Sequence, residues 1–156
     1  MNTKEEMLMA SKQGKVWGTT EEIVSNASFE FHRLEFKKNS NCSIHRHQTK
    51  FNGFFVESGR MMIEVWESAD PYFEGDDLHG MGDPDKTFLT AGDYFEVLPG
   101  TYHRFTGIES GVAFEVYWSE YWSDDITRLT HGDRWSDENP EREESTPENN
   151  LNHDGE

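Results

Sequence analysis

This chain of 156 residues predicts an all-β fold, a jelly-roll or barrel of short antiparallel strands. From Lys15 to about Trp122 the chain is rich in Phe, Trp, Tyr and Val, which are common in strands. These residues occur in short runs bounded by Gly, Asn, Asp and Pro, which is the spacing of strands and turns. Since almost nothing in this region indicates a helix, a small barrel is the fold class that accommodates the pattern.

The expected strands follow one another at short intervals. In chain order they are Glu22–Val24, Phe29–Lys37, Cys42–His47, Gly53–Glu57, Arg60–Glu67, Thr87–Thr90, Tyr94–Val97, His103–Thr106 and Val112–Trp118. Turn-forming residues separate several of them, at Lys38–Asn41, Glu57–Gly59, Ala91–Asp93 and Leu98–Gly100.

The length predicts a single domain, which we place at residues 14–135. Residues 1–13 are polar apart from a short apolar patch and are expected to form an N-terminal arm. Residues 136–156 are acidic and carry almost no apolar side chain, so we expect a disordered tail. Residues 68–86 form an acidic stretch that is too long for a simple hairpin loop and lacks EF-hand spacing, so a solvated loop is expected there.

The formal net charge is -17, from 31 acidic and 14 basic residues. Nucleic acid and anionic membranes both require a basic face, so neither is expected as a partner. No apolar run approaches the roughly 18 residues of a membrane span, and the N-terminus lacks the pattern of a signal peptide. The single cysteine, Cys42, excludes an internal disulfide and is expected to be a structural thiol, which fits the reducing cytoplasm.

Three histidines carry most of the chemistry in the sequence. His45 and His47 lie two residues apart, so on one strand their side chains would share a face. His103 follows a Pro-Gly turn on a distant strand and would supply a third imidazole. Three imidazoles on one metal ion leave coordination positions open for substrate.

The spacing around these histidines resembles the two sequence motifs of the cupin family. His45-Arg-His47 is followed after four residues by Asn52 and after six more by Gly59, as in the first motif. Gly92, Leu98-Pro-Gly100 and His103 are similar to the second. The resemblance implies a double-stranded β-helix barrel that holds a divalent metal ion (zinc, manganese, nickel or iron) through His45, His47 and His103.

The chain departs from the cupin pattern at the position that bears most on the metal. Asn52 stands where the family places a glutamate ligand, so the fourth donor is expected to be a neutral amide oxygen. Asn39 also replaces the Gly that begins the first motif, and Leu98 replaces a Pro of the second.

A narrower resemblance links this chain to the C-terminal cupin domain of mannose-1-phosphate guanylyltransferase and type II mannose-6-phosphate isomerase. The similar segments are Lys15–Gly18, Phe31–Lys37, Phe114–Glu120 and Ser123–Arg128. This resemblance implies a pocket for a sugar or sugar phosphate as the small-molecule substrate. The cupin family also implies a homodimer as the oligomeric state.

Proton transfer between sugar carbons requires a base and groups that hold the ligand. We expect Glu115 to act as the base, with Glu35 as an alternative. Lys50 or Arg33 would hold a phosphate, and stacking on a sugar face is expected from Tyr117 and Trp118. Alternation along Val112–Trp118 predicts that the apolar set forms the core, namely Val112, Phe114, Val116 and Trp118.

Three functions are consistent with these residues. The first is a metal-dependent sugar-phosphate isomerase or epimerase. The second is an iron-dependent cupin oxygenase, because three histidines without a carboxylate also suit iron and dioxygen. The third is a non-catalytic sugar-binding module.

Overall fold

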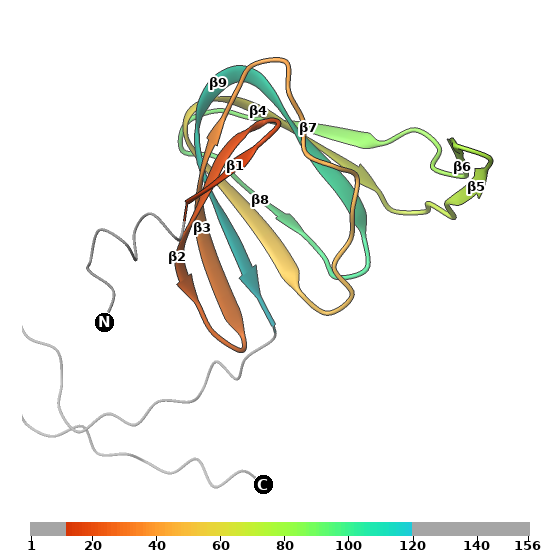
Figure 1. Cartoon of the computed structure of the whole chain (residues 1–156), viewed down its shortest axis with the longest axis horizontal. Coiled ribbons are helices and arrows are strands. Elements are labelled where there is room, and N and C mark those ends of the chain that lie inside the picture. Colours follow the sequence, from red (N-terminus) through yellow and green to blue (C-terminus); the bar gives the residue numbers. More distant parts are fainter. Residues whose placement is uncertain (1–11, 120–156) are drawn as a thin grey trace, which may run out of the picture. The chain divides into compact units, whose positions relative to one another are not determined.

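The computed structural model describes residues 12–119, and this part of the chain is all-β, without any helix (Figure 1). The expected all-β class is therefore confirmed. Its strands are β1 (Lys12–Lys15), β2 (Gly18–Ser25), β3 (Phe29–Phe36), β4 (Phe51–Trp66), β5 (Tyr72–Glu74), β6 (Asp77–His79), β7 (Asp85–Leu89), β8 (Tyr94–Val97) and β9 (Tyr102–Trp118).

Seven of the strands form one antiparallel sheet in the order β1-β2-β3-β9-β4-β7, and β8 also pairs with β4. The remaining two strands, β5 and β6, form a separate hairpin that lies apart from the others in Figure 1. This hairpin falls within residues 68–86, where the sequence predicted only a loop. The acidic segment is long because it contains a hairpin of its own.

The two longest strands, β4 and β9, correct the predicted strand boundaries. Each was expected to be two strands, yet each runs unbroken for 16 or 17 residues. Their pairing shifts register near Ser58 and Arg60, so the expected turn at Glu57–Gly59 is a bulge within β4. The first part of β4 pairs with β8, and the last part pairs with β7. Each of β4 and β9 is therefore one bent strand where the sequence predicted two separate strands.

Two other expectations about strands also need correction. Residues Cys42–His47 form no strand, and only isolated bridges at Asn41 and His45 connect this segment to β9. At the N-terminal end, β1 begins at Lys12, within the segment expected to be an arm. The rest of that arm and the tail at residues 136–156 lie outside the described residues, so both remain predictions.

The buried interior lies on the face of β9 opposite to the one predicted. Ala113 and Glu115 are buried, whereas Phe114 and Trp118 are half-buried on the outer face. There, Phe114 stacks on Phe31 with ring centroids 5.4 Å apart. The prediction failed because alternation assigns the face with Glu115 and Tyr117 to solvent. In the structure both faces of β9 are covered, so the more apolar face need not be the inner one. The apolar core is a cluster of Trp17, Leu34, Phe36, Cys42, Phe54, Val56, Met61, Ile63, Leu89, Val97, Phe105 and Ala113.

Candidate metal centre and cavity

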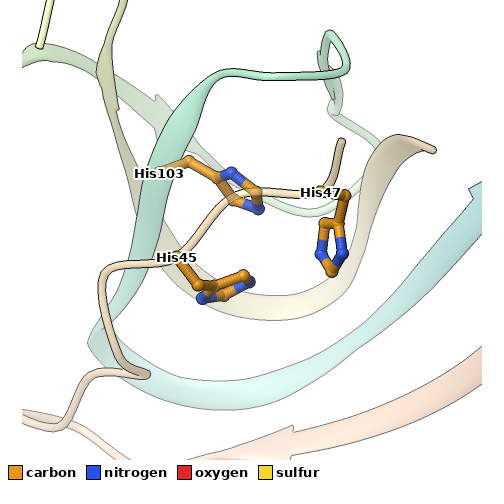
Figure 2. Close-up of side chains that lie close together, drawn as sticks. All are labelled: His45, His47 and His103. Atoms are coloured by element: carbon orange, nitrogen blue, oxygen red, sulfur yellow. The ribbon is translucent and has the colours of Figure 1, made fainter. Parts of the chain in front are cut away.

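The three predicted histidines converge on one point inside the barrel (Figure 2). Their nearest candidate ligand nitrogens all lie within 4.8 Å of one another. His103 comes from β9, and the backbone of His45 pairs with that of His103 through two hydrogen bonds of 2.9 and 3.1 Å. The local pairing to β9, rather than a shared strand face, therefore brings His45 and His47 to His103.

Backbone carbonyls fix the orientation of two of the rings. The Nδ1–H of His45 donates to the carbonyl of Ser43 at 2.8 Å, and that of His103 donates to the carbonyl of Thr101 at 2.9 Å. In a neutral imidazole this leaves Nε2 with a free lone pair, which is the form that binds metals. The Nε2 atom of His47 is buried and has no hydrogen-bond partner among the described residues.

Asn52 lies beside the three histidines and adds an amide to the candidate donor set. Its Oδ1 lies 2.9 Å from Nε2 of His103, the ring nitrogen that faces away from the Thr101 carbonyl. Its Nδ2 amide faces Oε1 of Glu115 at 3.3 Å and the carbonyl of Val116 at 3.5 Å.

The imidazole of His103 is buried inside the barrel. Burial lowers the pKa of its imidazole to about 4, so the ring is neutral near pH 7. A divalent cation would bind both the free Nε2 lone pair of His103 and the buried, unpartnered Nε2 of His47. The residues present therefore fit a divalent metal ion.

Glu115 lies beside this donor group, although its strand face was expected to be exposed. Its side chain is buried on β9, and Oε1 accepts hydrogen bonds from the Tyr117 hydroxyl at 2.5 Å and from Nδ2 of Asn52 at 3.3 Å. Burial raises the pKa of the Glu115 carboxyl, and the hydrogen bond from Tyr117 partly opposes this shift. A carboxyl group with a raised pKa is a stronger base when ionised.

A cavity of about 500 Å³ adjoins these groups. Its wall includes His45, His47 and Glu115, together with Lys50 and Tyr117. Of the alternative residues, Glu35 is exposed and paired with Arg33 at 2.7 Å on the outer face of β3. Trp118 also lies outside, where it stacks on Phe51. The structure therefore brings Glu115, Lys50 and Tyr117 to the cavity but not Glu35, Arg33 or Trp118.

Two cavity residues were missed by sequence reasoning. Glu30 and His32 are not among the residues that the sequence predicted for the site, yet both line the cavity. Strand alternation could have revealed them. Glu30 and His32 lie on the same face of β3 as the buried Leu34 and Phe36, because all four are spaced two residues apart.

Cys42 is buried near the cavity, where its sulfur accepts a hydrogen bond from the Phe105 amide at 3.2 Å. Burial raises the pKa of this thiol to about 12, so it is not a nucleophile at neutral pH. The expectation of a structural thiol agrees with this environment.

The fold is that of a cupin barrel, as comparison with solved structures shows. KdgF from Halomonas sp. is 16% identical over 73% of this chain and 88% of its own, with a TM-score of 0.54. A RmlC-like cupin from Shewanella frigidimarina is 17% identical over 81% of this chain and 95% of its own, with a TM-score of 0.53. Oxalate decarboxylase of Bacillus subtilis has Mn(II) centres. It is 12% identical over 75% of this chain and 30% of its own, with a TM-score of 0.54.

These likenesses establish the cupin fold and not a particular activity. No protein-family model and no curated protein matches the sequence. The narrower resemblance to mannose-1-phosphate guanylyltransferase stays a prediction. Within residues 12–119, the structure has no helix that could cross a membrane.

Proposed function

We propose that this protein is a divalent-metal cupin that binds a sugar or sugar phosphate and transfers a proton between neighbouring carbons. The observation that carries the proposal is the position of Glu115. Its carboxyl group lies in the cavity wall beside the candidate metal ligands and is bound by Asn52 and Tyr117. An isomerase or epimerase needs a base in this position, whereas a simple binding site does not.

His45, His47 and His103 would hold the ion, with Asn52 as a weak fourth donor. A divalent ion supplies Lewis acidity, which polarises the carbonyl and hydroxyl oxygens of a bound sugar. Zinc, manganese, nickel and iron all suit imidazole ligands.

The residues of the chain would perform the remaining steps. Glu115 would take the proton from one carbon and return it to the next, while Tyr117 holds the carboxylate in place through its hydroxyl. Lys50 and Glu30, which also line the cavity, would contact the oxygens of the ligand.

Metal analysis tests the first half of the proposal. The protein, purified without a chelating tag, is expected to contain about one divalent ion per chain. His45→Ala, His47→Ala and His103→Ala should each weaken metal binding by more than about 100-fold, since residues that merely orient ligands already contribute 10–100-fold. Full metal content in the triple variant would place the metal elsewhere.

Deuterium exchange tests the second half. When metal-loaded protein is incubated with an aldose or its 6-phosphate in D₂O, proton NMR is expected to show loss of the C2 proton. Glu115→Gln should abolish this exchange while keeping the metal. Glu35→Gln, which changes an exposed carboxylate on the outer face of β3, is the matched control and should exchange at the wild-type rate. Equal exchange in Glu115→Gln would exclude this residue as the base.

An iron-dependent oxygenase is the second candidate, and one observation favours it. With Asn52 as the fourth donor beside His103, the ligand set would contain three imidazoles and no carboxylate. Bound iron together with oxygen consumption on addition of substrate would support this function. Metal and sugar binding without proton exchange or oxygen uptake would instead indicate a non-catalytic binding module.

A further inference from the structure

The cavity contains a second polar group besides the candidate metal ligands. It consists of Glu30 and His32 on β3 and Lys50, all of which line the cavity. The ammonium of Lys50 donates to Oε1 of Glu30 at 2.9 Å. Oε2 of Glu30 lies 3.5 Å from Nε2 of His32, and that nitrogen has no other partner in the described part of the chain. Lys50 therefore holds one oxygen of the carboxylate, and the ring of His32 faces the other.

The pairing of Lys50 changes what this lysine can bind. Its charge is already opposed by Glu30, and its Nζ also lies over the ring of Tyr117, 5.7 Å from the centroid. A phosphate placed beside Lys50 would therefore meet the Glu30 carboxylate as well. Like charges at such distances repel each other strongly where water is partly excluded. The other lysine in the cavity wall, Lys15, is exposed.

A hydroxyl group suits the same pair without this repulsion. It donates to a carboxylate and accepts from an ammonium, so one or two sugar hydroxyls can bind Glu30 and Lys50 together. Both side chains are partly accessible, at 29% and 43%, so a ligand in the cavity can reach them.

We propose that the Glu30–Lys50 pair makes this cavity selective for an uncharged polyhydroxy ligand, such as a free sugar, over its phosphate ester. The inference rests on the proposed function, and it narrows the substrate class that the sequence left as a sugar or a sugar phosphate. His32 packs against Tyr117 in an edge-to-face contact and faces the carboxylate of Glu30.

A paired titration tests the proposal. Calorimetry on metal-loaded protein at fixed ionic strength compares D-mannose and D-fructose with their 6-phosphates. The free sugars are expected to bind about tenfold or more tightly than the phosphates. Glu30→Gln keeps the shape and removes the charge, so it should reduce that preference by about tenfold. Glu35→Gln removes a charge from the outer face of the same strand and should leave the preference unchanged.

The outcomes separate this inference from the proposal on which it rests. Tighter binding of the phosphates to the wild type would overturn the selectivity, and so would an unchanged preference in Glu30→Gln that still binds metal. Either result would leave the proposed roles of the metal ligands and of Glu115 standing. If metal-loaded wild type binds none of the four sugars, the proposed function and the selectivity both fail. The wild type alone shows whether the free sugars or their phosphates bind more tightly. An unstable Glu30→Gln variant therefore does not prevent the test.

Discussion

Asn52 sets the charge of the candidate metal centre. It is 1% exposed and lies between His103 and Glu115, so one amide touches both the ligand group and the proposed base. A carboxylate in its place would offset part of the metal charge and repel Glu115. With a divalent ion bound, the amide would leave the site more electropositive, which would strengthen the polarisation of a bound carbonyl.

Asn52→Glu is therefore expected to tighten divalent metal binding, because it adds an anionic oxygen of the kind that hard cations prefer. Gln has the same length as Glu but carries no charge, so Asn52→Gln is the matched control. Titration against a competing chelator measures both affinities. Equal affinity of the two variants would mean that residue 52 does not reach the ion.

Two long strands decide the shape of the barrel. β4 and β9 bend together, and the bend requires a close approach of their backbones near Gly59 and Gly111. Gly59 has a φ of 78°, a conformation that favours glycine, and a Cβ on Gly111 would lie 2.0 Å from the carbonyl oxygen of Ser58. A backbone atom cannot move aside as a flexible side chain can, so the contact requires a glycine.

Gly111→Ala is expected to lower the free energy of unfolding by about 1–3 kcal/mol, as overpacking of a close contact does. Gly14→Ala in β1 is the control, since nothing lies within 4 Å of its added Cβ. Its effect should stay within about 0.5 kcal/mol. Urea denaturation followed by tryptophan fluorescence measures both. If the two variants were equally stable, the strands would have room to separate at the bend.

At the scale of the molecule, the barrel and the tail have different compositions. Residues 136–156 are acidic and carry few apolar side chains, and the whole chain has a formal net charge of -17. Such a segment contributes little buried area and adds charge repulsion.

Truncation at Ser136 is therefore expected to leave the melting temperature and the metal content unchanged. Thermal unfolding monitored by circular dichroism, together with elemental analysis, provides the measurement. A drop of several degrees in the truncated protein would show that this segment stabilises the barrel.

The sequence by itself determined the fold class and the three histidines. Residue types and turn spacing report local preferences, and the histidine motif spans a short segment with a recognisable spacing. The amide at Asn52 in place of a carboxylate also follows from the sequence alone, because this residue lies at a fixed distance from His47.

Only the tertiary structure decided which face of β9 points inward and which cavity residues meet. Alternation assigns Glu115 and Tyr117 to one face and Phe114 and Trp118 to the other, but it cannot tell which face is covered. That depends on the strands that pair on both sides of β9, which place Phe31 against Phe114 and Asn52 beside Glu115. The Glu30–Lys50 pair likewise joins residues 20 positions apart. Burial of a polar group is stabilised by partners distant in sequence, so local pattern cannot reveal it.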